Sequence, residues 1–206
     1  MTATLARQSG ARPSGAAPTS PPSPAPVAQQ GRSPLGAASM ELAATIGLAI
    51  YSVVAALSFN RVFGDDQFLG DVLIVVAVGH GSSLAVRLAR VPAVLGVLIT
   101  LAALVWTVGY LHYPESYSAF LPGPDTWDVA RADLSLVRQQ FREAVAPVAY
   151  VGGWALLASV GAAFVVFTGD TLAFRANGRG EALVPGAVLF VFVTALGIDD
   201  HRIASA

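Results

Sequence analysis

The sequence contains no cysteine and no lysine, and it is poor in charge of either sign. Without cysteine the chain can form no disulfide, no thiolate nucleophile and no Cys-ligated metal site. Charged residues make up only 12 % of the chain, whereas about a quarter of the residues of a soluble domain are charged. The net charge is −1 and no basic cluster is present, so we expect no nucleic-acid partner.

Apolar residues dominate instead, at 54 % of the chain with a mean hydropathy of +0.62. They form five runs close to the ~20 residues that a helix needs to cross a hydrocarbon core of about 30 Å. Continuous apolar runs favour helices over the alternating pattern of barrel strands. The predicted fold class is therefore all-α: residues 40–206 form a polytopic membrane helix bundle in the lipid bilayer, with about five spans at 42–59, 68–87, 92–111, 149–167 and 182–198.

The first 39 residues have a different composition. They hold seven of the thirteen prolines, among Ser, Ala, Gly and Gln. Such a segment buries too little apolar surface to offset its ordering entropy, so 1–39 is predicted to be a disordered tail. The first apolar run begins near residue 42 and is about as long as a full span, which argues against a cleavable signal peptide.

The arginines in short connections predict the orientation. The connections after the second and fourth spans hold four arginines, while the connection 60–67 holds one beside two aspartates; the four are Arg87, Arg90, Arg175 and Arg179. Because cytoplasmic loops are enriched in arginine, we expect a cytoplasmic N-terminus and an extracytoplasmic 112–148 segment. Basic residues that are all arginine, together with abundant Ala, Gly and Val, indicate a bacterial source and hence a plasma-membrane location.

Small and aromatic residues predict how the spans pack and where they end. Ala155, Ser159 and Ala163 recur every four residues, and Gly79 and Ser83 do the same, which is typical of close helix packing. Aromatic residues cluster at the end of the third span, where they predict an interfacial belt: Trp106, Tyr110, Tyr113 and Tyr117.

One long segment mixes charge and apolar character at helical spacing. Its apolar stripe consists of Trp127, Ala130, Leu134, Val137, Phe141 and Val145. The pattern predicts an extracytoplasmic amphipathic helix over about 125–146, capped by Asp125 or Thr126 and stopped by Pro147. Either the helix is a lid with its stripe packed inward on the bundle, or it is a docking surface for a partner.

Two ionisable residues fall inside a predicted span, Asp71 and His80. Nine residues at 100° each place them on opposite helix faces, which excludes a direct relay between them. For His80 we favour a neutral imidazole bonded to a hydroxyl of a neighbouring helix over a proton carrier. His112 and His201 show no metal-ligand spacing, and no phosphate loop or nucleophile elbow occurs, so no metal, cofactor-binding or catalytic residue is predicted.

Three segments resemble a known family: "LSFNRVFGDDQFL", "YPESYSAFLPGPDTWDVARADLSLVRQQFREAVAPV" and "DTLAFRANGRGEALVPGAVLFVFVTALG". Together, over about residues 41–200, they are similar to the membrane-embedded N-terminal domain of bacterial transglutaminase-like proteins of the TgpA type. In that family a transglutaminase-like domain follows outside the membrane, where its Cys, His and Asp perform acyl transfer or peptide hydrolysis.

The resemblance implies a function without implying catalysis. Because this chain has no cysteine and ends at Ala206, we expect the catalytic domain to be missing, in either a truncated member or a stand-alone module. The predicted function is a non-catalytic membrane domain that anchors or regulates a transglutaminase-like enzyme. The alternative is a small transporter or channel subunit that uses His80 and Asp71.

Overall fold

The computed structural model describes residues 34–118, 120–141, 143–176, 178 and 180–196. Most of the predicted tail (1–33), Arg179 and residues 197–206 thus lie outside the described part. The helices are α1 (Pro34–Ala56), α2 (Asn60–Phe63), α3 (Phe68–Leu88), α4 (Ala93–His112), α5 (Pro124–Gln140), α6 (Gly152–Phe174) and α7 (Val184–Leu196). Short 3₁₀ turns lie at η1 (Leu57–Phe59), η2 (Pro114–Ser116) and η3 (Glu181–Leu183), and two-residue strands β1 (Tyr117–Ser118) and β2 (Leu121–Pro122) pair antiparallel.

The all-α membrane bundle is confirmed. Four helical segments of the described chain are long and apolar enough to cross a membrane, and they are Ser39–Phe63, Phe68–Leu88, Ala93–His112 and Gly152–Phe174. The fifth predicted span corresponds to the shorter apolar helix Glu181–Leu196, and its last predicted residues lie beyond the described chain. α1 begins at Pro34, five residues before the predicted end of the tail at residue 39, because proline is well tolerated in a first helical turn.

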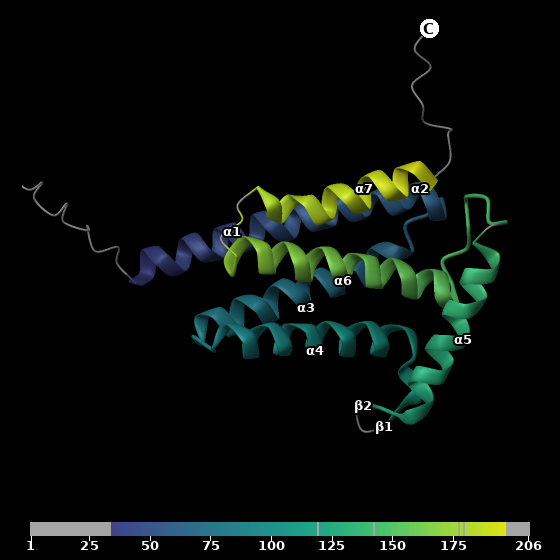
Figure 1. Ribbon diagram of the computed structural model, residues 1–206, viewed down its shortest axis with the longest axis horizontal. Helices are drawn as coiled ribbons and strands as arrows, with labels where there is room; N and C mark the ends of the chain where they lie inside the picture. The colour runs from purple at the N-terminus through teal and green to yellow at the C-terminus, as the bar shows by residue number, and fades with distance from the viewer. Residues whose placement is uncertain (1–33, 119, 142, 177, 179, 197–206) are drawn as a thin grey trace, which may run out of the picture. The chain divides into compact units, whose positions relative to one another are not determined.

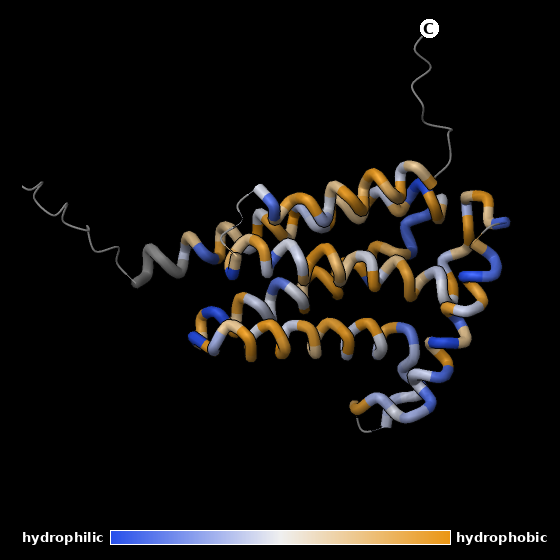
Figure 2. The backbone as a smooth tube through the Cα atoms, viewed as in Figure 1, coloured by the Kyte–Doolittle hydropathy of each residue, from blue (hydrophilic) through white to orange (hydrophobic). Residues whose placement is uncertain are grey.

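The helices of the bundle consist mostly of apolar residues (Figure 2). Many large aliphatic and aromatic side chains are uncovered by protein, among them Ile50, Val54, Leu98, Phe164 and Val191. In water such a surface would be unstable, whereas in hydrocarbon it loses nothing by remaining exposed. The distribution of exposed apolar side chains therefore matches the bilayer environment that composition predicted.

Small residues bring the helix backbones together inside the bundle, as predicted. A Cβ added at Gly79 of α3 would overlap Val166 Cγ1 of α6 and would lie 2.9 Å from Leu104 Cδ2 of α4. Ser159 is fully buried, and Ala155 is almost so. Close backbone approach replaces the hydrophobic driving force that is lacking between helices in lipid.

Aromatic side chains close the end of the bundle nearest α5. Phe59, Phe63, Phe68 and Tyr150 pack against one another with centroid distances of 5.0 to 6.4 Å. Beside them, the Val148 backbone N–H donates to the Val62 carbonyl over 2.8 Å. The chain segment after α5 is thereby fixed on the end of α2.

The predicted aromatic belt also forms. Trp106 and Tyr110 stack with centroids 5.2 Å apart, and Tyr117 meets both rings edge-on. The Trp106 indole donates to the Phe120 carbonyl over 2.7 Å, which ties the β1–β2 hairpin to α4.

α5 crosses the end of the bundle at a steep angle to the spans (Figure 1). Its predicted cap is wrong: Gly123 is the N-cap, Pro124 occupies the first turn, and the Thr126 hydroxyl bonds to Ser116 instead. The helix ends at Gln140 rather than 146, because the following residues turn back toward α2.

The inward stripe of α5 is only partly realised. Val137 is buried against α6. A Cβ added at Gly153 of α6 would lie 2.5 Å from the Asp133 carbonyl oxygen and 2.6 Å from Val137 Cγ2, so the two helices are in close contact here. Trp127, in contrast, is 63 % exposed, and Leu134, Phe141 and Val145 are exposed as well. The prediction that the whole stripe faces inward is therefore wrong, because within the stripe only Ala130 and Val137 pack against the bundle.

Candidate functional site

Arg87, in the last turn of α3, is the centre of a buried polar network. Its guanidinium donates to both carboxylate oxygens of Asp170 (2.8 and 2.9 Å), to Glu41 Oε1 (3.1 Å) and to the hydroxyls of Thr45 (2.7 Å) and Ser83 (2.8 Å). These partners come from α1, α3 and α6. A single guanidinium therefore joins three helices through charge-assisted bonds.

His80 lies about two turns before Arg87 on α3 and completes what we call the Arg87 cluster, made of Glu41, Thr45, Ser52, His80, Ser83, Arg87 and Asp170. Its Nε2 is 3.2 Å from the Ser52 hydroxyl of α1. The expectation that His80 bonds to a hydroxyl of a neighbouring helix is thus confirmed. Its Nδ1 is buried without a hydrogen bond among the described residues and lies 3.7 Å from Asp170 Oδ1.

Apart from His80 Nδ1, the charged groups of the Arg87 cluster are paired. Ser83 donates a hydrogen bond to Asp170, and the centre of the Phe174 ring lies 3.8 Å from the Arg87 guanidinium carbon. Asp170 and Arg87 side chains are only 3 % and 10 % exposed. Because an uncompensated charge at this position would be costly, the carboxylate and the guanidinium each require the other.

Asp170 is the residue that sequence reasoning missed. The fourth span was predicted to end at residue 167, which assigned Asp170 to a loop, but α6 continues to Phe174. The available signal was the lack of proline between the apolar run and Asn177-Gly178, since a single glycine such as Gly169 is tolerated within a helical pattern. Arg87 was similarly counted as a loop arginine, although it is paired inside the bundle.

A second group of polar side chains, the Tyr150 cluster, lies where α3 and α6 begin and α4 ends. It consists of Asp71, His112, Tyr150 and Ser159. The Tyr150 phenol donates to Asp71 Oδ2 over 2.7 Å, and His112 Nε2 lies 2.8 Å from the Ser159 hydroxyl. Burial and the bond to Asp71 raise the pKa of Tyr150 well above its usual value, so the phenol stays a donor.

The loop after α4 is tied to α5 by similar chemistry. The Tyr113 phenol donates to Asp133 Oδ2 over 3.0 Å. Burial, then the hydrogen bond and charge of Asp133, raise the pKa of Tyr113. α5 is therefore anchored by a polar bond near its middle as well as by Val137.

Asp71 and His80 belong to separate clusters, as their spacing on α3 predicted. Nine residues of helix separate them by about 13 Å along the axis. The layer between is apolar and buried, with Val72, Val75, Val76, Leu104 and Val166 among its members. No hydrogen bond of the described residues connects the two clusters through this layer.

The Ser159–His112 contact has the atoms of a nucleophile–base pair, and sequence spacing could not reveal it because α4 and α6 are distant in the chain. Ser159, however, has no exposed surface. A substrate carbonyl could not reach its hydroxyl without separating α4 from α6. In the observed arrangement the contact satisfies two buried polar groups. Within the described residues, no three His, Cys, Asp or Glu side chains converge as metal ligands would.

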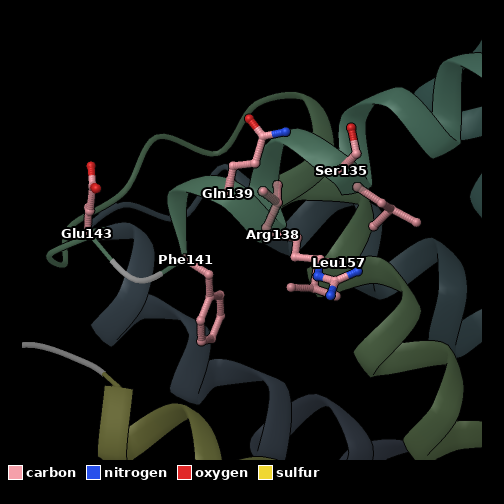
Figure 3. Close-up of a pocket in the computed structure, with 8 residues that line it drawn as sticks. Ser135, Arg138, Gln139, Phe141, Glu143 and Leu157 are labelled. Carbon is pink, nitrogen blue, oxygen red and sulfur yellow. The ribbon is translucent and has the colours of Figure 1, made fainter.

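A groove between the end of α5 and the surface of α6 is the remaining feature of note (Figure 3). We call it the α5 groove. It has a volume of about 950 Å³ and is lined by Leu134, Ser135, Val137, Arg138, Gln139, Phe141, Glu143 and Leu157.

Known proteins give no further assignment. No family model matches the chain, and no curated protein or solved structure matches it. The fold and the two clusters therefore establish a helical membrane protein whose described spans are joined by internal polar networks.

Proposed function

We propose that the chain is a non-catalytic membrane domain that anchors, and through α5 regulates, an extracytoplasmic transglutaminase-like enzyme. The proposal places the protein in a bacterial plasma membrane with its N-terminus in the cytoplasm. Its support is the family resemblance of residues 41–200 together with the membrane bundle. A reporter active only in the cytoplasm, fused at residue 176, should be active, and silence there would contradict this orientation.

The observation that carries the proposal is the contrast between the interior and α5. In the interior, buried ion pairs and an apolar layer fill the space between helices. On α5, by contrast, Trp127, Val129 and Leu136 remain 63 %, 43 % and 51 % exposed. Exposed tryptophan is the residue most enriched at binding hot spots, so α5 is the natural contact for a partner domain.

The alternative is a transporter or channel subunit, and one observation favours it. The Nδ1 of buried His80 has no hydrogen bond to a described residue and faces Asp170 at 3.7 Å, as a proton-binding group would. Against it stands the apolar layer that separates His80 from Asp71. A pathway would have to cross that layer, and no hydrogen bond between described residues connects the two clusters across it.

The two functions differ in a direct experiment. The full chain, reconstituted in liposomes, is mixed with a purified transglutaminase-like domain of the family, and co-flotation is measured. We expect binding that Trp127→Ala weakens roughly tenfold or more, because a buried tryptophan anchor is worth about 2 kcal/mol. Leu95→Ala, an exposed apolar residue on α4, should leave binding unchanged.

The same liposomes report on transport. Proton flux that His80→Ala abolishes, with no co-flotation of the catalytic domain, would replace the anchor by the transporter. Absence of both flux and co-flotation would contradict the proposed function as well.

A further inference from the structure

The β1–β2 hairpin folds back beside α4 instead of extending away from the bundle (Figure 1). The Trp106 indole of α4 donates to the carbonyl of Phe120 at the hairpin tip over 2.7 Å, and the Tyr117 phenol of β1 donates to the Trp106 carbonyl over 3.3 Å. A Cβ added at Gly109 of α4 would overlap the Tyr117 hydroxyl, so this glycine leaves the space in which the phenol lies. These contacts hold the hairpin against the side of α4.

The contact with Trp106 places the hairpin tip level with a candidate membrane span. α4 has 20 residues, so its length of about 30 Å equals the thickness of the hydrocarbon core. Trp106 lies six residues before the last residue, His112, which is about 9 Å from that end of the helix. The stacked rings of Trp106 and Tyr110 are of the types that mark the boundary between hydrocarbon and headgroups. Both observations place the hairpin tip at this boundary rather than in bulk water.

The hairpin lies at the end of a lipid-facing stripe of α4. The stripe consists of exposed apolar and aromatic residues spaced by four, three, four and four positions, and they are Leu95, Ile99, Ala102, Trp106 and Tyr110. Among the four candidate spans, α4 is the least covered by the rest of the protein, with 28 % of its most apolar stretch buried. On the hairpin, Phe120 and Leu121 are 71 % and 68 % exposed. These two side chains therefore continue the surface that the stripe presents to lipid.

The backbone conformation of Phe120 shows that the turn itself does not favour this residue. Its φ is 66°, in the left-handed region where glycine and asparagine are the usual residues. For a residue with a Cβ this region costs about 1 to 2 kcal/mol. The ring recovers little of that cost by packing on the protein, because most of it is exposed. A contact with lipid gives a physical reason for phenylalanine at this position.

The composition of the hairpin suits a place at the membrane surface. Residues 116–124 contain no charged side chain, whereas Glu115 and Asp125 stand on either side of them. The two strands pair antiparallel, and the carbonyl at the tip accepts from the α4 indole. Charges and unbonded backbone groups are the main costs of entering lipid. The tip can therefore reach the edge of the hydrocarbon while the base of the hairpin stays in water.

We propose that the β1–β2 hairpin is a membrane-inserting tip. The side chains of Phe120 and Leu121 lie in the edge of the hydrocarbon beside α4, and the strands lie at the level of the headgroups. The partner of this surface is the lipid of the adjoining leaflet. Because Gly123, just after β2, is the N-cap of α5, the insertion fixes the start of α5 at the membrane. This contact goes beyond the proposed anchoring function and does not depend on it.

The absence of cysteine makes the test direct, because a single introduced cysteine is then the only site for a nitroxide label. Phe120→Cys and Leu121→Cys are made separately in the full chain, which is reconstituted in phosphatidylcholine liposomes. Electron paramagnetic resonance measures collisions of the label with oxygen, which concentrates in lipid, and with a water-soluble nickel chelate. We expect oxygen collisions to exceed nickel collisions at both positions, as for Leu98→Cys on the exposed side of α4. Asp128→Cys on α5, where the aspartate side chain is 76 % exposed, should show the reverse.

A second substitution tests whether the apolar side chain holds the tip in lipid. Phe120→Asp, added to labelled Leu121→Cys, should move the label into water, so that nickel collisions exceed oxygen collisions. Phe120→Leu is the matched control and should leave the label in lipid. Because the Phe120 ring is mostly exposed, both variants should keep the circular dichroism of the wild type.

Three results would overturn the proposal. Nickel collisions that exceed oxygen collisions at residue 120 or 121 of the singly labelled chains would show a hairpin in water. Few collisions with either reagent would show that the tip is covered by protein, such as a second copy of the chain. A label at residue 121 that stays in lipid after Phe120→Asp would show that the contacts with α4 hold the hairpin there without any contribution from the phenylalanine.

Discussion

Replacing Arg87 by methionine should be among the most damaging single changes in the bundle. Methionine keeps the volume of the unbranched stem and ends about where the guanidinium begins, so the charge, the guanidinium contact with Phe174 and all five hydrogen bonds are lost. What remains is Asp170, whose side chain is 3 % exposed, without its cationic partner. The change therefore isolates the charge of the network from its volume.

Two magnitudes decide the size of the effect. Polar contacts between membrane helices average about 0.6 kcal/mol, so four partners would account for roughly 2 kcal/mol. Leaving a buried charge without its partner costs about 3 to 5 kcal/mol. Glu41 adds little, because its side chain is 33 % exposed and can reach water. We expect Arg87→Met to lower the free energy of unfolding by about 3 kcal/mol.

The pairing of charges makes a sharper prediction for the double variant. Removing both charges, with Arg87→Met and Asp170→Leu together, eliminates the unpaired carboxylate, and such replacements are often neutral. The double variant should therefore recover most of the loss. Stability is measured by unfolding the full chain in mixed micelles with a denaturing detergent, followed by circular dichroism. Arg131→Met, at a pair that is 80 % and 76 % exposed, is the matched control and should change stability by less than about 0.5 kcal/mol.

Additive losses in the double variant would refute this reasoning, because a buried ion pair must show a coupling energy between its members. A loss below about 1 kcal/mol for Arg87→Met alone would do the same. It would mean that water reaches Asp170 in the folded protein.

Two other predictions concern packing and pH. In the same unfolding assay, Gly79→Ala should lower the free energy of unfolding by about 1 to 3 kcal/mol through overpacking. Gly81→Ala, whose Cβ would meet nothing within 4 Å, should be neutral or stabilising. Equal effects of the two changes would mean that α3 and α6 are further apart than described. Burial and its hydrogen bond raise the pKa of Tyr150 above the ordinary value of about 10, so its contribution to stability is complete below about pH 10 and is lost as pH rises through the folded-state pKa. The tyrosinate absorbance of the folded protein should consequently rise at higher pH than that of the unfolded chain, and Tyr150→Phe should remove part of this difference. If the two titrations coincide, Tyr150 is not buried as described.

The existence of the spans could be predicted because an apolar run of about 20 residues has few alternatives to a helix in lipid. Their ends were less predictable. α6 continues seven residues past its predicted end because its polar residues are satisfied internally: the Thr168 hydroxyl donates to the Phe164 carbonyl over 2.5 Å, and Asp170 binds Arg87. Polar residues after an apolar run look like a loop when their partners are unknown.

Partners across helices could not be predicted from the sequence. Helical periodicity placed Asp71 and His80 on opposite faces of α3, and this was correct, but it could not identify Tyr150 and Ser52 as their partners. Those pairings depend on which helices are neighbours, and hydropathy carries no information about that. The exposure of most of the α5 stripe could not be predicted for the same reason, because an amphipathic pattern does not indicate how much of a helix its neighbours cover.

The presence of α3 in both polar clusters limits how this helix can move. A shift by one residue would translate it by 1.5 Å and rotate its side chains by 100°. Asp71 would leave Tyr150 at one end in the same step in which Arg87 would leave Asp170 at the other. Sliding or screw motions of α3 would thus break bonds at two depths at once, which leaves the peripheral α5 as the element best suited to respond to a partner.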